Sequence, residues 1–315
     1  MLLSVVIPVY GAPTILPVLY ERLVAALSPW TDFELIMVND HCPQGSGNIL
    51  EELAAKDRRV KFIDFIRNYG QHIAIAAGLD YARGDYAVVM DCDLQDQPEE
   101  IKKMYDHLAG GGFEAVFGVR INRQHGTMRR LESKVFNVLY RLLAQNATKT
   151  TQNIGNFSII SRKAIDAHRL FRESERLYGA VIGRILPEAG YVEVAHSQRC
   201  DGESSYTLIK KFRLAANTII ANSNKPLIFA VYCALGAFAL SLLIGLKILV
   251  SYLLYGTAVS GWTSLMLALC FFSGLQMLFL GVLGAYMGSA STAVKHRPLY
   301  IISKSRNVSG APEKQ

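Results

Sequence analysis

Several signatures of common protein classes are missing from this sequence. No Gly-x-Gly-x-x-Gly follows an early apolar run, which disfavours a dinucleotide-dependent dehydrogenase. The cysteines are odd in number and contain no Cys-x-x-Cys, so neither a disulfide framework nor a zinc site is indicated. This usage fits a reducing, cytosolic setting. Residues 1–10 lack the basic start of a signal peptide, and we interpret them as a first strand.

Charge is missing from two long apolar segments. Hydrophobic residues make up 51% of the chain, and its mean hydropathy is +0.21. Residues 227–246 and 262–290 contain no Asp, Glu, Lys or Arg, and each exceeds or matches the roughly 20 residues that cross a bilayer. We predict two transmembrane helices, at about 227–254 and 262–290, within a membrane region 226–290. A helical hairpin in a soluble core is the alternative, and the lack of charge inside either segment disfavours a transporter.

Positive charge flanks these segments. The loop 255–261 is uncharged, whereas basic residues precede and follow the pair: Lys210, Lys211, Arg213, Lys225, Lys295, Arg297, Lys304 and Arg306. By the positive-inside rule, both termini are predicted to be cytoplasmic in a multi-pass protein of the bacterial inner membrane. The net charge of +7 would also suit nucleic acid, but the cations gather beside the spans and lack interleaved aromatic residues. Residues 291–315 are predicted to form a polar cytoplasmic tail, frayed from Ser303.

Residues 1–203 alternate between two patterns. Apolar, β-branched runs at 2–9, 34–38, 60–63 and 86–90 predict strands, and helical spacing at 15–27, 49–55 and 73–82 predicts helices between them. Such alternation is typical of an α/β fold with a mostly parallel sheet. The carboxyl ends of the strands then share one edge, where ligands bind in such folds.

Three acidic residues and an amide follow the strand at 86–90. On a continuing strand, Asp91, Asp93 and Gln95 would lie on one face. Carboxylate and amide oxygens suit Mg²⁺ or Mn²⁺. A polar loop without function is the alternative for Asp-x-Asp taken alone.

Successive short blocks resemble glycosyltransferase family 2, and specifically its polyprenyl-phosphate branch, which includes dolichol-phosphate mannose synthases and undecaprenyl-phosphate sugar transferases. The blocks are Ile7-Pro-Val-Tyr10, Val38-Asn-Asp40, Arg67-Asn-Tyr-Gly-Gln71, Ala77-Gly-Leu-Asp-Tyr-Ala82, Asp91-Cys-Asp-Leu-Gln-Asp96, Gly118-Val-Arg120, Gly202-Glu-Ser-Ser-Tyr206 and Arg297-Pro-Leu-Tyr300. The resemblance implies a GT-A, Rossmann-like domain. It further implies inverting, metal-dependent sugar transfer from a nucleotide sugar to polyprenyl phosphate.

The same resemblance implies roles for single residues. Donor binding is expected at Pro8, Val9, Tyr10, Val38, Asp40, Arg67, Gln71, Asp91, Cys92, Asp93 and Asn156, with Asp91, Asp93 and Gln95 holding Mg²⁺ or Mn²⁺. The acceptor phosphate is expected at Arg120, Arg129, Ser133, Arg199 and Ser204, and the catalytic set is Asp91, Asp93, Arg120 and Arg129. Guanidinium groups bind phosphate in bidentate fashion. Asp40 could instead cap the helix that follows it.

Two basic, amphipathic segments are predicted near the membrane. Apolar residues recur at helical spacing through 128–142 and 204–225, with Arg and Lys between them. Such helices can lie on anionic lipid headgroups, although a core helix with a solvated basic face has the same pattern.

The chain departs from the family pattern at four places. Gly11-Ala12 stands for Asn-Glu, His41-Cys42-Pro43-Gln44 for Gly-Ser-x-Asp, Asn156-Phe157-Ser158 for Asp-Phe-Arg, and Ser205 for a lysine. We expect a rebuilt donor pocket, with a uridine-linked sugar as the favoured donor and a guanosine-linked or modified pentose donor as the rival. A lipid phosphate is already a dianion at neutral pH, so no general base is expected at Asn156.

Two other functions fit the sequence less well. A processive polysaccharide synthase would carry Gln-x-x-Arg-Trp, which neither Trp30 nor Trp262 forms. A non-catalytic membrane scaffold would not need Asp91 and Asp93. The resemblance also implies a possible homo-oligomer, since relatives include tetramers.

Overall fold

The computed structural model describes residues 1–11, 13–120, 154–172, 177–186, 188–195, 261–295 and 297–308, with isolated positions between 232 and 254. Two compact units are distinguished. One contains the N-terminal residues together with the segment from Arg297 onward, and the other contains the long helix α10 (Trp262–Val294).

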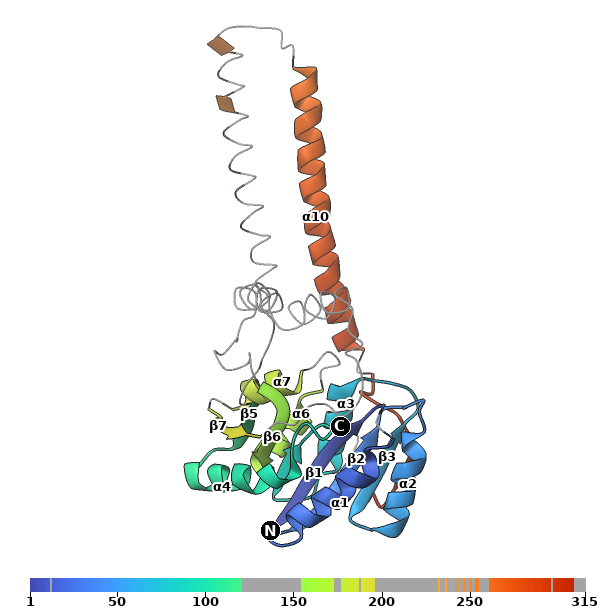
Figure 1. Ribbon diagram of the computed structural model, residues 1–315. Coiled ribbons are helices and arrows are strands. Elements are labelled where there is room, and N and C mark those ends of the chain that lie inside the picture. The colour runs from blue at the N-terminus through green and yellow to red at the C-terminus, as the bar shows by residue number, and fades with distance from the viewer. Residues whose placement is uncertain are drawn as a thin grey trace. The chain divides into compact units, whose positions relative to one another are not determined.

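The first unit is an α/β domain (Figure 1). Its strands are β1 (Leu2–Val9), β2 (Asp32–Asn39), β3 (Val60–Phe65), β4 (Tyr86–Val89), β5 (Ala115–Arg120), β6 (Ile154–Ser161), β7 (Gly190–Val194) and β8 (Ile302–Arg306). Its helices are α1 (Leu16–Leu27), α2 (Ser46–Lys56), α3 (Gln71–Tyr81), α4 (Ile101–Gly111), α6 (Arg162–Leu170) and α7 (Tyr178–Ile185), with a 3-10 turn at Pro98–Glu100. The strands and helices expected from the apolar spacing are confirmed.

The strands form one sheet in the order β7-β5-β6-β4-β1-β2-β3-β8. β1 pairs in parallel with β2 and β4, β2 with β3, and β5 with β7, whereas β6 and β8 are antiparallel to their neighbours. The central strands are apolar along their whole length because helices cover both faces. One core lies on the face of α1, α2 and α4, and the other lies on the face of α3, α6 and α7.

Helix α3 is buried nearly all round, from Ile73 to Asp80. Such a helix must pack between other elements, because it is apolar on all sides and has no polar face to expose to solvent. It packs so closely on β1 that a Cβ at Gly78 would lie 2.3 Å from Cγ1 of Val6. This close approach fixes where the first residue of α3, Gln71, lies above the sheet.

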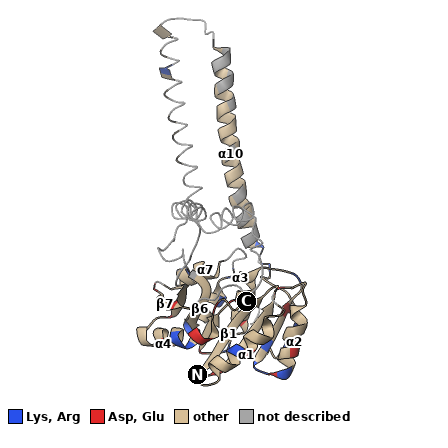
Figure 2. Ribbon diagram, viewed as in Figure 1, with Lys and Arg blue, Asp and Glu red and all other residues tan. Residues whose placement is uncertain are grey.

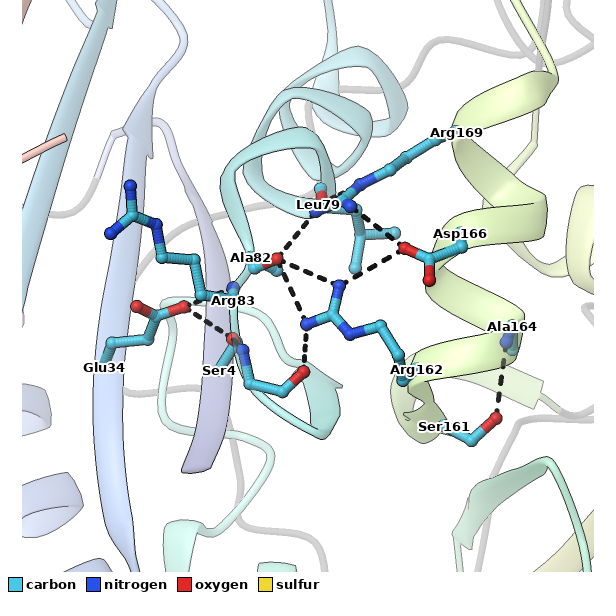
Figure 3. A network of polar contacts seen from close by, with 11 residues as sticks. Ser4, Glu34, Leu79, Ala82, Arg83, Ser161, Arg162, Ala164, Asp166 and Arg169 are labelled. Carbon is cyan, nitrogen blue, oxygen red and sulfur yellow. Dashed lines mark hydrogen bonds and ion pairs between the residues drawn. The ribbon is translucent and has the colours of Figure 1, made fainter. Parts of the chain in front are cut away.

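The amino edge of the sheet is held by arginines (Figure 3). Arg169 donates to the carbonyl oxygens of Leu79 (3.0 Å) and Ala82 (2.6 Å), and Arg162 donates to Ala82 (3.2 Å) and Gly84. The carbonyls of Leu79 and Ala82 lie at the C-terminal end of α3, where the helix dipole favours a cation, and Gly84 follows in the loop. The two guanidinium groups therefore tie α6 to the end of α3.

A buried ion pair lies at the same edge. Glu34 on β2 pairs with Lys61 on β3, and both side chains are 8% exposed. The Glu34 carboxylate also accepts from the Ser4 hydroxyl (2.6 Å) and from the backbone N–H of Arg83 (2.7 Å). These further hydrogen bonds offset the cost of removing the charge from water.

The C-terminal segment adds a strand to this sheet, so the expectation of a frayed tail from Ser303 is wrong for residues 303–306. β8 pairs antiparallel with β3. Tyr300 stacks on Phe65 with 5.3 Å between ring centroids, and the Asn307 amide donates to the carbonyls of Ala54 (2.6 Å) and Val60 (2.9 Å). A polar segment is ordered here because β3 would otherwise present an unpaired edge.

Helix α10 belongs to the second unit. Its stretch Phe271–Gly288 is long and apolar enough to cross a membrane, with a mean hydropathy of 1.5, and none of it is buried. Figure 2 shows no Lys, Arg, Asp or Glu along the parts of α10 drawn in colour. This is the one such helix among the described residues. The predicted span at 227–254 lies outside them except at isolated helical positions, and the predicted amphipathic helix at 204–225 lies wholly outside them.

Candidate active site

The acidic residues follow β4 in a turn, not on a continuing strand. β4 ends at Val89, and Leu94 has a left-handed φ of 58°. The carboxylate of Asp93 accepts the backbone N–H of Gln95 at 3.2 Å, which closes a local turn. The expectation that Asp91, Asp93 and Gln95 line one strand face is therefore wrong, because the chain bends as soon as Asp93 can bond its own backbone.

Asp91 is the point where three elements meet. Its Oδ1 accepts from the Gln71 side chain at 2.6 Å and from the Asn156 side chain at 3.4 Å. Gln71 begins α3 and Asn156 lies on β6, so two expected donor-binding residues, one from a helix and one from a strand, contact a third. Two amide donors on one carboxylate oxygen fix the orientation of the whole group.

Cys92 lies inside the turn, between the two acidic residues. It is 8% exposed, and burial raises the pKa of its thiol to about 12. A thiol this far from ionising behaves as a small apolar side chain. Cys92 therefore supports the turn through packing.

The expected nucleotide residues lie at the ends of β1 and β2. Pro8 pairs with Val38 in register, and Val9 pairs with Asn39. Val9 and Val38 are fully buried in opposite cores, so their side chains are not exposed at the carboxyl edge. Tyr10 is 56% exposed at that edge. A ligand here would contact the Tyr10 side chain and the backbone of its neighbours.

Asp40 is nearly buried and holds the start of α3. Its two carboxylate oxygens accept the backbone N–H groups of Tyr69 (2.6 Å) and Gly70 (2.8 Å). Burial raises the pKa of Asp40, and these two hydrogen bonds oppose that shift. The residue therefore stabilises the helix that carries Gln71, not the helix that follows it in sequence.

Arg67 lies in the loop between β3 and α3. Its guanidinium lies 4.7 Å from the centre of the Tyr69 ring, and its side chain is exposed. The preceding residue, Ile66, donates its backbone N–H to Ile301 at 3.1 Å. The loop is thus held on one side by the C-terminal segment.

Two departures from the family pattern contact each other. The backbone N–H of Gly11 donates to Sγ of Cys42 at 3.1 Å, and the Ser46 hydroxyl donates to the same sulfur at 3.2 Å. Burial raises the pKa of the Cys42 thiol, but these hydrogen bonds outweigh it and the pKa is lowered overall. The loops after β1 and β2 are therefore joined through Cys42.

Two polar contacts were missed by sequence reasoning. The hydroxyl of Tyr178 contacts that of Ser158 at 2.8 Å, and the Tyr300 hydroxyl donates to Asp80 at 2.8 Å. Tyr300 and Asp80 belong to two of the family blocks, and Ser158 ends the departure Asn156-Phe157-Ser158, but the sequence did not indicate these contacts. Tyr178 belongs to none of the blocks.

The expected acceptor residues are not described by the structure. Arg129, Ser133, Arg199 and Ser204 lie outside the described residues, and only the backbone of Arg120, at the end of β5, lies within them. Their roles stay predictions.

Comparisons with known proteins show the family of the chain. Residues 4–169 match the model of glycosyl transferase family 2. The chain is 32% identical over 308 residues to the SfII prophage-derived bactoprenol glucosyl transferase of Shigella flexneri, covering 97% of this chain and 98% of the relative. It is 33% identical over 312 residues to an undecaprenyl-phosphate 4-deoxy-4-formamido-L-arabinose transferase of Pectobacterium carotovorum subsp. carotovorum (strain PC1), covering 96% and 92%.

A solved structure supports the fold. Mannosyl-3-phosphoglycerate synthase from Rubrobacter xylanophilus superposes with a TM-score of 0.50 at 14% identity, covering 70% of this chain and 72% of that one. A mostly parallel sheet with an acidic turn at its carboxyl edge is the arrangement of a GT-A glycosyltransferase. The chain belongs to glycosyl transferase family 2, and the resemblance to its polyprenyl-phosphate branch is confirmed.

Proposed function

We propose that this glycosyltransferase moves a sugar from a nucleotide sugar, favoured as uridine-linked, to polyprenyl phosphate at the cytoplasmic face of a bacterial inner membrane. The contacts of Gln71 and Asn156 with Asp91 carry the proposal, because three of the residues expected to bind the donor lie within hydrogen-bond distance of one another. The relatives named as bactoprenol and undecaprenyl-phosphate transferases support the acceptor. Helix α10 supports attachment to a membrane.

The acidic turn fits a divalent metal that is shared with the nucleotide. No group of three His, Cys, Asp or Glu side chains able to hold a metal occurs in the described part of the chain. Mg²⁺ commonly uses one or two carboxylates and completes its coordination with substrate phosphates and water. Asp91 and Asp93 supply such a pair, with Gln95 beside them. Bound there, Mg²⁺ or Mn²⁺ would neutralise charge on the departing nucleoside diphosphate.

The acceptor can attack without a general base. A phosphomonoester has its second pKa near about 6, so at neutral pH it arrives with an ionised oxygen. This agrees with an amide at Asn156 in place of a carboxylate, since no proton is taken there. Repulsion between the two anionic substrates must still be offset, and we assign this to Arg120, Arg129 and Arg199. Attack opposite the leaving diphosphate inverts the anomeric centre.

The test is transfer by the full chain in lipid nanodiscs, supplied with undecaprenyl phosphate and a panel of nucleotide sugars. We expect Asp93→Ala to abolish transfer while the melting temperature stays close to that of the wild type. Asp106→Ala is the matched control, because Asp106 is an exposed carboxylate on α4 paired only locally with Lys102. Full transfer in excess chelator would exclude the metal. A product that keeps the anomeric configuration of the donor would exclude direct inversion.

A further inference from the structure

A buried hydroxyl pair lies next to Asn156. Ser158 is two residues further along β6, and it is fully buried. Its hydroxyl donates to the carbonyl oxygen of Asn156 at 3.0 Å and contacts the Tyr178 hydroxyl at 2.8 Å. The carbonyl can only accept. Ser158 has one proton to give, so Tyr178 must be the donor within the pair.

Tyr178 is suited to this donor role. It is the first residue of α7 and is 1% exposed. Burial raises the pKa of its phenol, with the contact from Ser158 opposing the shift, so the hydroxyl stays protonated across the physiological range. The direction of these hydrogen bonds is therefore fixed: the Tyr178 hydroxyl donates to the Ser158 hydroxyl, which donates to the carbonyl oxygen of Asn156.

Tyr178 also contacts the other side of the Asp91 cluster. Its backbone N–H donates to Nδ1 of His72 at 3.3 Å, and His72 follows Gln71 in α3. The residues next to both amide donors of Asp91 are thus connected to the start of α7. A displacement of Tyr178 would therefore shift the side-chain amides of both Gln71 and Asn156.

We propose that Tyr178 is a positioning residue of the donor site, acting through Ser158 to hold the Asn156 amide against the Asp91 carboxylate. The inference rests on the proposed function, and it names the part of the site that replaces the charged Asp-Phe-Arg block of the relatives. A neutral hydroxyl relay takes the place of a charged pair. Outer partners of this kind affect metal affinity by about 10- to 100-fold when they are removed.

The experiment compares Tyr178→Phe and Ser158→Ala with the wild-type full chain. Tyr178→Phe keeps the ring and removes only the donor. We expect each variant to weaken Mn²⁺ binding in the presence of UDP by about tenfold, as followed by electron paramagnetic resonance of free Mn²⁺. As Mn²⁺ affinity falls, we expect the KM for the nucleotide-sugar donor to rise, while the KM for undecaprenyl phosphate is unchanged. We expect the double variant to bind Mn²⁺ no more weakly than the more impaired of the two single variants, because either change interrupts the same chain of hydrogen bonds.

Tyr20→Phe is the matched control. It also removes a tyrosine hydroxyl bonded to a neighbour, the Asp57 carboxylate at 2.8 Å, but on α1 across the sheet. We expect a similar loss in melting temperature and no change in Mn²⁺ binding. Wild-type Mn²⁺ affinity in Tyr178→Phe, or equal effects of the two tyrosine variants, would overturn the positioning role. Normal Mn²⁺ and UDP binding without transfer to polyprenyl phosphate would instead overturn the proposed function alone, and no binding by the wild type would overturn both.

Discussion

The two edges of the central sheet use polar side chains in different ways. At the amino edge, guanidinium groups bind main-chain carbonyls that end α3, and Arg162 and Arg169 each reach more than one of them (Figure 3). At the carboxyl edge, the contacts around Asp91 join side chain to side chain, from a turn to a helix and a strand.

We infer that the arginine contacts at the amino edge stabilise the fold, whereas the Asp91 contacts at the carboxyl edge serve the reaction. A hydrogen bond from an arginine to a main-chain carbonyl holds the position of the backbone itself, so such bonds stabilise the fold. Side-chain amides on a carboxylate can be exchanged for a metal ion or a phosphate when a substrate arrives. The arginines thus anchor the fold at the amino edge, whereas the Asp91 contacts at the carboxyl edge can rearrange. Asp40 binds backbone N–H groups at the carboxyl edge and anchors the start of α3 there.

The largest effect should come from removing charge at the carboxyl edge. Asp91→Asn keeps an oxygen that can accept from Gln71 and Asn156, so the cluster stays assembled while the carboxylate is lost. We expect the rate of transfer to fall by about a hundredfold or more, the scale of losing one charged contact in the transition state. The melting temperature should change little. Steady-state kinetics and thermal unfolding of the full chain measure the two quantities.

Asp166→Asn applies the same substitution on α6, where Asp166 pairs with Arg162 and Arg169. There we expect a small loss of stability and an unchanged rate. If Asp91→Asn lowered stability while leaving the rate intact, the assignment of the two edges would be reversed.

The next effect should come from an arginine of the amino edge. Arg162→Ala leaves the Gly84 carbonyl without its guanidinium donor and leaves the Ala82 carbonyl with Arg169 alone, and we expect a loss of about 2 kcal/mol, since hydrogen bonds to charged groups contribute about 1.5–3 kcal/mol. The turnover number at a temperature where the protein is folded should be unchanged. Lys163→Ala is the matched control, because Lys163 is the next residue and its side chain is 77% exposed. A lower turnover number in folded Arg162→Ala would show that the amino edge also serves the reaction.

The parts of the fold that were predictable from sequence are those with local patterns. The apolar runs of β1 to β4 and the helical spacing of α1 predicted these elements closely, because burial on both faces leaves a continuous apolar signature. β8 has no such signature. Its residues after Ile302 are exposed, and its order comes from pairing with β3, far away in the sequence.

The candidate site was predicted in composition but not in geometry. Gln71, Asp91 and Asn156 were expected, and they meet. The strand continuation through Asp93 was wrong because a side chain that bonds its own backbone can end a strand without Gly or Pro. Tyr178 was missed, and Ser158 was noted only as a departure from the family pattern, because a buried tyrosine and serine look like core residues until the fold brings their hydroxyls together.

The smallest effect concerns the thiols of the carboxyl edge. Cys42 and Cys92 follow β2 and β4, on either side of β1, yet hydrogen bonds lower the pKa of Cys42 overall while burial raises that of Cys92 to about 12. The thiolate is the reactive form. We therefore expect iodoacetamide at pH 7.5 to alkylate Cys42 well before Cys92, as measured by peptide mass spectrometry, with the two rates equal in denaturant.

Ser46→Ala tests whether hydrogen bonds lower the pKa of Cys42, because it removes one donor to the Cys42 sulfur and leaves the backbone donor at Gly11. A hydrogen bond of about 1 kcal/mol to the thiolate corresponds to about 0.7 of a pKa unit, so alkylation of Cys42 at neutral pH should slow about fivefold. The rate at a pH above the pKa should be unchanged, since the thiolate is then fully formed. A rate that falls equally at both pH values would mean that Ser46 controls access to the sulfur and not its ionisation.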